Sequence, residues 1–156
     1  MGHRGCRPAQ AQRGLAMVEM VITLPLLLLL LFAFGEFGRM LFQYNSLMQA
    51  SRDAGRFVSG QAWNPTLGKL SLSADLVSQT RSVAVYGVPA NPSGYPPVVP
   101  GLTTDKVTVQ AVGTDHVQVS ISYTFVPVIG SAIPALYGQS VPLGLTLTST
   151  VVMRAL

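Results

Sequence analysis

Acidic, histidine and cysteine side chains carry most enzyme and metal chemistry, and this chain has six acids, two histidines and one cysteine. Asp115 and His116 are adjacent in an expected turn, where strand geometry would send their side chains apart. The sequence contains no phosphate-binding loop, zinc hydrolase motif or serine nucleophile motif. The aspartates, which lack the spacing of a metal site, are Asp53, Asp75, Asp105 and Asp115. The sequence therefore predicts no enzyme activity, no cofactor, no metal site and no small-molecule substrate.

One carboxylate has an unusual position, because Glu19 directly precedes an uncharged apolar run from Met20 to Gly35. A carboxylate inside a membrane helix costs roughly 2.5–3.5 kcal/mol and is rarely kept without a partner or an interfacial position. The order of a basic leader, a glycine, four residues, a glutamate and an apolar run resembles the type IV prepilin signature. That resemblance implies cleavage between Gly14 and Leu15, which would create a cationic amine as a partner for Glu19.

Two other interpretations of the N-terminal segment remain open. The first is an ordinary signal peptide with a loose cleavage site at residues 33–35, Ala-Phe-Gly. The second is an uncleaved anchor in which Glu19 reaches toward the cytoplasmic interface. All three interpretations place the rest of the chain outside the cytoplasm.

Composition separates a membrane protein from a nucleic-acid binder. Hydrophobic residues make up 49% of the chain and charged residues 10%, against about a quarter charged in soluble proteins. The formal charge is +4, and Arg4, Arg7 and Arg13 supply most of it, so no basic stripe remains for nucleic acid. Positive residues beside a first membrane helix tend to stay inside, which predicts a cytoplasmic N-terminus, and the prepilin resemblance implies the bacterial inner membrane. Cys6 is the only cysteine, so no disulfide forms within the chain.

Helical periodicity continues past the apolar run and predicts one helix from about Ala16 to Ser59. We expect a leader at 1–14, a transmembrane segment at 15–38, a helical continuation at 39–60 and an extracytoplasmic domain at 61–156. Arg13, Glu36 and Arg39 are expected at the membrane interfaces, with Glu36 and Arg39 able to pair weakly. The apolar face of the continuation comprises Phe37, Met40, Leu41, Tyr44, Leu47, Met48, Ser51, Ala54, Gly55 and Val58.

The remaining sequence predicts a small α+β domain. A second helix is possible within Leu67–Tyr86, its best part beginning after Ser73 as N-cap. Residues 87–101 are a proline-rich loop. Alternating patterns predict a three-stranded antiparallel sheet with one polar face. Its strands are expected at Lys106–Val112, His116–Val126 and Val141–Arg154. The apolar segment Pro127–Gly138 could cover the sheet, which we favour, or rest on the membrane or a partner.

With this organisation the chain resembles the TadE-like family of the tight-adherence, or Flp, pilus system. The resemblance rests on residues 13–60, with RG-x-A-x-VE, the LP-L run, E-F-G-R at Glu36–Arg39 and the small-residue stretch ASRDAGR. Weaker support comes from SYTFVPV at Ser122–Val128 and the closing Met153-Arg154. It implies a minor pilin or pseudopilin, cut by a prepilin peptidase, whose partners are other pilin-like subunits and the pilus assembly platform.

Overall fold

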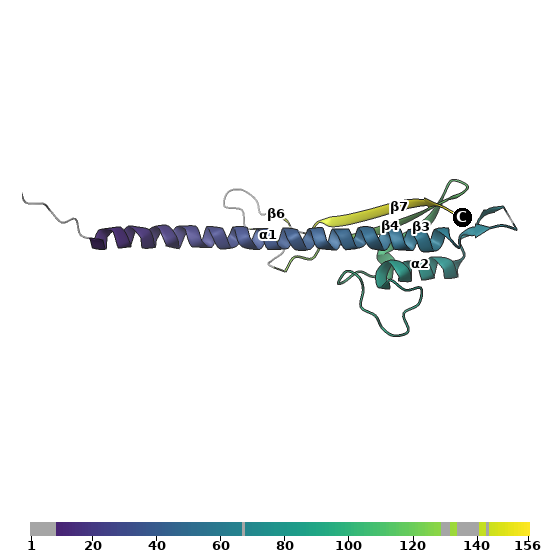
Figure 1. The fold of residues 1–156 in the computed structure, drawn as a ribbon, viewed down its shortest axis with the longest axis horizontal. Helices are drawn as coiled ribbons and strands as arrows, with labels where there is room; N and C mark the ends of the chain where they lie inside the picture. Colours follow the sequence, from purple (N-terminus) through teal and green to yellow (C-terminus); the bar gives the residue numbers. More distant parts are fainter. Residues whose placement is uncertain (1–8, 67, 129–131, 134–140, 143) are drawn as a thin grey trace, which may run out of the picture. The chain divides into compact units, whose positions relative to one another are not determined.

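The computed structural model describes residues 9–66, 68–128, 132–133, 141–142 and 144–156, with side chains from residue 16 onward apart from 132–133 and 141–142. The chain divides into two compact units, residues 1–38 and 39–156. A long N-terminal helix, a second helix and a three-stranded antiparallel sheet are present (Figure 1). The predicted α+β class is therefore confirmed.

Helix α1 spans Ala9–Ser59 and contains Pro25. It begins earlier than the sequence suggested, because residues 9–13 are Ala, Gln and Arg, which have good helix propensity. Its predicted end is confirmed. The Gly60 amide donates to the Arg56 carbonyl at 3.2 Å, and the Ala62 amide donates to the Val58 carbonyl at 2.9 Å.

Helix α2 spans Ala74–Tyr86, and its caps explain both of its ends. The Ser73 hydroxyl accepts a hydrogen bond from the Leu76 amide at 3.2 Å, which confirms the predicted N-cap. Gly87 follows with a φ of 75°, the left-handed conformation that commonly ends helices. The sequence also allowed a longer helix that begins at Leu67. That possibility is wrong, because the residues directly after Leu67 are not helical. Gly68 has a φ of 60°, and β1 (Trp63–Asn64) pairs with β2 (Lys69–Leu70) as a short hairpin.

The sheet has the order β3–β4–β7, with β3 at Val107–Val112, β4 at His116–Thr124 and β7 at Thr146–Arg154. A short 3-10 turn, η1 (Thr104–Lys106), leads into β3. Both strand pairs are antiparallel, with Val107 opposite Ile121 and Val119 opposite Val151. The expected alternation is confirmed in the central strand, where Val117, Val119, Ile121 and Tyr123 are buried. Its other face is rich in serine and threonine.

The third strand is shorter than the sequence predicted. Val141–Pro142 forms a separate short strand, β6, which pairs with β5 (Ala132–Ile133). Pro142 lacks an amide hydrogen and Gly144 follows soon after, so a regular ladder does not extend back from Thr146. Most of the segment Pro127–Gly138 lies outside the described residues. The prediction that this segment covers the sheet therefore stays a prediction.

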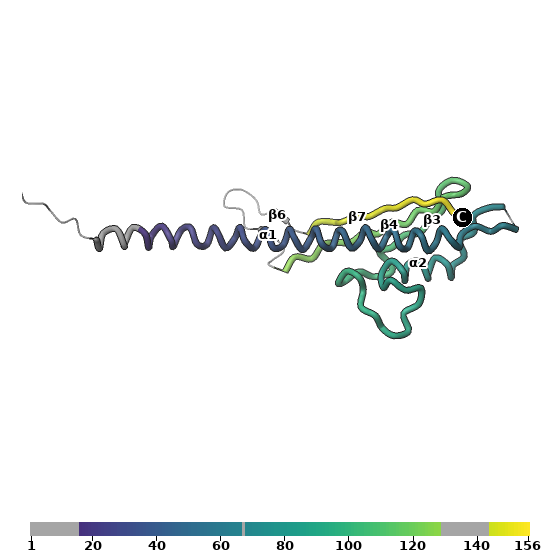
Figure 2. Tube along the Cα trace, viewed as in Figure 1, coloured from purple at the N-terminus to yellow at the C-terminus, as the bar shows by residue number. Residues whose placement is uncertain are grey.

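The proline-rich loop at 87–101 contains neither helix nor strand, as predicted (Figure 2). Asn91 fixes its outer part, because its side-chain amide donates to the Tyr95 carbonyl at 2.9 Å and its side-chain oxygen accepts from the Tyr95 amide. The Tyr123 hydroxyl donates to the Pro100 carbonyl at 2.9 Å. The loop is therefore held by both local bonds and the sheet.

The core of the second unit lies between α1, α2 and the inner face of the sheet. Leu47, Ala54 and Val58 of α1 are completely buried. The sequence placed Leu41 and Tyr44 on the same face, but they are 44% and 37% exposed. The contact is narrower than the apolar sector of the helix, so the larger side chains at its edge stay uncovered.

Candidate membrane anchor and the junction of α1 with the sheet

The first unit has the side-chain distribution of a membrane segment. Every side chain of α1 from Ala16 to Phe32 is exposed, and those between Met20 and Phe32 carry no charge. A helix that is apolar on all sides is stable only when protein or lipid surrounds it. Among the described residues, α1 is the one helix long and apolar enough to cross a bilayer.

The predicted processing residues lie in this helix. The backbones of Arg13, Gly14 and Leu15 belong to α1, and their side chains lie outside the described part of the chain. The Glu19 side chain is exposed. In the part of the chain that the structure describes, its carboxylate takes part in no hydrogen bond or ion pair. Among the residues that the structure describes, Glu19 therefore lacks the partner that a carboxylate in lipid requires.

The two residues expected at the outer interface have different surroundings. Glu36 is 7% exposed. The Arg39 guanidinium lies 4.5 Å from the centre of the Phe125 ring and donates a hydrogen bond to the Val126 carbonyl. Both contacted residues lie in the segment directly after β4. Arg39 thus fixes this end of the sheet to α1, a role that the sequence did not reveal.

Small residues bring α1 and β7 together. The hydroxyl oxygens of Ser51 and Ser149 are 2.8 Å apart, and both side chains are buried. One turn further, a methyl group on Gly55 would lie 2.6 Å from a methyl group of Val151. The helix can approach the strand only because position 55 has no side chain. Figure 1 shows β7 beside this part of α1. The four-residue spacing of Ser51 and Gly55 was the available sequence signal.

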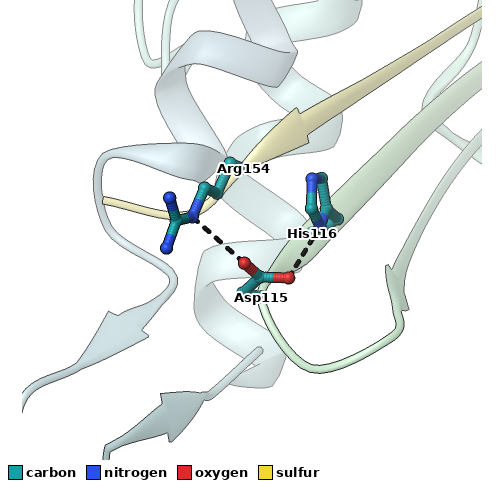
Figure 3. A network of polar contacts seen from close by, with 3 residues as sticks. All are labelled: Asp115, His116 and Arg154. Atoms are coloured by element: carbon teal, nitrogen blue, oxygen red, sulfur yellow. Dashed lines mark hydrogen bonds and ion pairs between the residues drawn. The ribbon is translucent and has the colours of Figure 1, made fainter.

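A polar cluster closes the far end of the sheet (Figure 3). The Asp115 carboxylate lies 2.7 Å from His116 Nδ1 and 3.0 Å from Arg154 Nε. The prediction that the side chains of Asp115 and His116 diverge is wrong, because Asp115 belongs to the turn and strand alternation begins only at His116. The Asp115 carbonyl also accepts from the Ala155 amide at 2.7 Å. The cluster joins the turn to the end of β7.

Among the residues described, no group of three or more His, Cys, Asp or Glu could hold a metal ion. The comparison with known families concerns the anchor instead. Residues 14–56 match the model of the TadE-like protein family. The matched segment begins at Gly14, lies entirely in α1 and includes Glu19, Arg39, Ser51 and Gly55.

The TadE-like match agrees with the resemblance seen in the sequence and connects the chain with Tad pilus systems. Proteins of this family are pilus-associated and generally non-enzymatic. Together with the apolar helix, the match indicates a membrane-anchored protein with pilin-like partners. No curated protein and no solved structure matches the chain.

Proposed function

We propose that this protein is a minor pilin or pseudopilin that takes part in assembly of a Tad pilus. It is held in the bacterial inner membrane by α1, with the N-terminus in the cytoplasm and the second unit outside. A prepilin peptidase cuts it after Gly14. The observation that carries the proposal is the TadE-like match, which begins at that glycine and follows α1 to residue 56.

Glu19 links processing to assembly. Cleavage after Gly14 creates the amine of Leu15, and the mature chain then holds one cation and one carboxylate within five residues. In the described structure the Glu19 carboxylate has no partner of its own. A carboxylate and an amine attract each other strongly where water is excluded. The amine of a neighbouring pilin-like subunit can therefore bind Glu19 and set the axial position of each helix in the assembly.

The second unit serves as a folded head for this helix. Its core is apolar, its central strand buries four large side chains, and Arg39 and Ser51 connect it to α1. These contacts make the head rigid against the outer part of the helix. Such a unit suits contacts with other subunits and with the assembly platform.

The mass of the N-terminal peptide from membranes tests the processing step. We expect a mature chain that starts at Leu15 when the prepilin peptidase is present and at Met1 when it is absent. Gly14→Val should block cleavage, whereas Gly38→Ala, in the same helix, should not. A chain starting at Met1 in the presence of the peptidase would favour an uncleaved, membrane-anchored binding module. A chain starting at Glu36 would contradict both.

Glu19→Gln tests the assembly role separately. The substitution removes the charge but keeps the size, so membrane insertion should persist while pili counted by electron microscopy are lost. Asp53→Asn, which removes an exposed carboxylate on the same helix, is the matched control and should leave pili unchanged. Normal pilus numbers with Glu19→Gln would exclude the proposed pairing.

A further inference from the structure

Trp63, on the hairpin of β1 and β2, lines two open hollows on the surface of the second unit. One has a volume of about 430 Å³ and lies between the hairpin and the start of α2. The other has a volume of about 510 Å³ and lies between the hairpin, the turn from β3 to β4 and the end of β7. Trp63 is partly buried, and its indole N–H takes part in no hydrogen bond among the described residues. Because a tryptophan in such surroundings usually has a polar partner, this donor is available to a ligand.

The larger hollow is positively charged, and we call it the cationic hollow. Lys69 and Arg154 line it, together with the carboxylate of Asp115. Asp115 is already engaged by Arg154 Nε at 3.0 Å and by His116 Nδ1 at 2.7 Å. The terminal nitrogens of Arg154 point away from this carboxylate in Figure 3. Lys69 takes part in no ion pair or hydrogen bond within the described part of the chain. The hollow therefore attracts a second carboxylate.

The smaller hollow has a different character, and we call it the polar hollow. Asp75 is the acid among the described residues that line it. Its other polar side chains are uncharged, and they are Gln61, Asn64, Ser71, Ser73 and Gln79. Those of Gln61, Ser71 and Gln79 take part in no hydrogen bond among the described residues. Amide and hydroxyl groups both donate to and accept from hydroxyl groups, so the polar hollow suits a neutral ligand rich in hydroxyls.

The two hollows are neighbours across the hairpin. Asn64 of the polar hollow stands opposite Lys69 of the cationic hollow in the register of β1 and β2. The Cβ atoms of side chains opposed in this way are about 4.5–5.5 Å apart. Trp63 belongs to both hollows, and the face of its indole ring is electronegative, so it attracts the C–H groups of a sugar ring. One chain of sugars can therefore reach both hollows across Trp63.

We propose that this surface binds an acidic polysaccharide in which sugars that carry a carboxylate alternate with neutral sugars. Lys69 and Arg154 bind the carboxylate, the polar hollow binds the hydroxyl groups of the neighbouring neutral sugar, and Trp63 contacts a sugar ring. An acidic peptide would satisfy the two cations, but it would bring no ring rich in hydroxyls to Trp63 and the polar hollow. The binding is a property of the folded second unit and does not depend on processing or pilus assembly.

A titration of the full chain in detergent tests the proposal. Trp63 is the only tryptophan, so its emission reports directly on a ligand at this surface, and calorimetry measures the affinity. The probes are the tetrasaccharides of hyaluronan and of unsulfated chondroitin, in which glucuronate alternates with a neutral sugar. Chitotetraose has neutral sugars and no carboxylate, whereas hexaglutamate has carboxylates and no sugar. The acidic tetrasaccharides should change the emission and bind at least about tenfold more tightly than either control, because they satisfy both hollows.

Each comparison decides one part of the proposal. Chitotetraose binding as tight as that of the acidic tetrasaccharides would exclude the carboxylate site. Hexaglutamate binding as tight would show that the surface recognises an acidic peptide or any anion, and would overturn the sugar ligand. Neither heat nor a change of emission with the acidic tetrasaccharides would overturn the proposal as a whole. These titrations use the unmodified chain, so their outcome does not depend on the folding of a variant.

Lys69→Met tests the cationic hollow, because it removes the charge and keeps most of the length. It should weaken binding of the acidic tetrasaccharides roughly fivefold, as expected for an exposed ion pair. Lys106→Met is the matched control, because Lys106 is the other lysine of the chain, is exposed and lines neither hollow. It should leave the affinity unchanged. Equal losses in the two variants would show that overall charge, and not this site, attracts the ligand.

Trp63→Leu tests the sugar contact, with calorimetry for the affinity and circular dichroism for the fold. The variant should lose the preference for acidic tetrasaccharides over hexaglutamate, because the cations remain while the indole ring is absent. A folded Trp63→Leu variant that keeps the full preference would contradict the contact between Trp63 and a sugar ring.

Discussion

The hydroxyl oxygens of Ser51 on α1 and Ser149 on β7 lie 2.8 Å apart in the interior of the second unit. Ser51 also donates to the Met48 carbonyl at 3.0 Å. A hydroxyl has one hydrogen, so Ser149 is the donor between the two serines and Ser51 the acceptor. This pair fixes where the strand lies along the helix, because a shift in either direction would leave a buried hydroxyl without its partner.

Replacing one of these two serines by alanine should lower the free energy of unfolding more than replacing both. Ser51→Ala leaves the Ser149 hydroxyl without an acceptor and should lower the free energy of unfolding by about 1–3 kcal/mol. The double variant with Ser149→Ala should recover part of this loss. Urea unfolding of the full chain in detergent, followed by Trp63 emission, measures each value. Additive losses in the double variant would mean that the serines do not interact.

Gly55→Ala should destabilise the second unit by about 1–3 kcal/mol, because the new methyl would overlap Val151 and crowd Met153. The cost should fall when Val151→Ala is combined with it, since the overlapping methyl group is then absent. Gly38→Ala is the control, because a methyl group there meets no atom within 4 Å. It should be neutral or stabilising through helix propensity. The same unfolding measurement applies, and equal effects at both glycines would refute the close approach.

Asp115→Asn should lower the free energy of unfolding by only about 0.2–1 kcal/mol, because the partners of the carboxylate are largely exposed. The backbone bond between the Asp115 carbonyl and the Ala155 amide remains in the variant. The effect should shrink near 1 M salt, where exposed charges are screened. Asp53→Asn serves as the control. A loss that is large and independent of salt would show that the cluster does more than close the sheet end.

The pH dependence of Asp105 follows from its neighbours. A hydrogen bond from the Thr103 side chain is the main cause that holds the pKa of Asp105 below 3.8, and Lys106 acts in the same direction. Because the pKa of Asp105 is lower in the folded chain than in the unfolded chain, its carboxylate stabilises the folded state at pH values above the pKa of the unfolded chain. This stabilisation is lost as the pH falls through the pKa of the folded chain. Thr103→Val should raise the pKa toward 3.8, while Thr103→Ser should keep it low. Carboxyl carbon chemical shifts over the acid range measure both, and an unchanged pKa in Thr103→Val would contradict the assignment.

Local patterns in the sequence predicted most of the elements. The apolar run and its helical continuation identified α1, Ser73 identified the start of α2, and the prolines identified the loop at 87–101. Alternation identified β3 and β4 and the inner face of the sheet. The third strand was predicted too long because its alternating pattern continues through Pro142 and Gly144, where a ladder is interrupted.

The same patterns determined the candidate anchor. Charge, hydropathy and the order of Gly14, Leu15 and Glu19 are properties of one continuous segment, so a membrane helix with a processing signal could be inferred without knowing any contact. The match to the TadE-like family covers this segment. For the apolar helix the sequence is sufficient, because lipid acts on a local stretch of chain, whereas the processing signal stays a prediction.

Only the tertiary structure decided which part of the helix meets the sheet and what lies at each end. The apolar face of α1 is wider than the part of it that contacts the rest of the second unit. Periodicity therefore does not reveal that Leu47 and Val58 are buried while Leu41 stays exposed. Likewise, Arg39 meets Phe125, and Arg154 meets Asp115, across long separations in the chain. Such pairs depend on strand order and on the angle of packing, which arise from many weak contacts acting together, whereas the helix depends mainly on neighbouring residues.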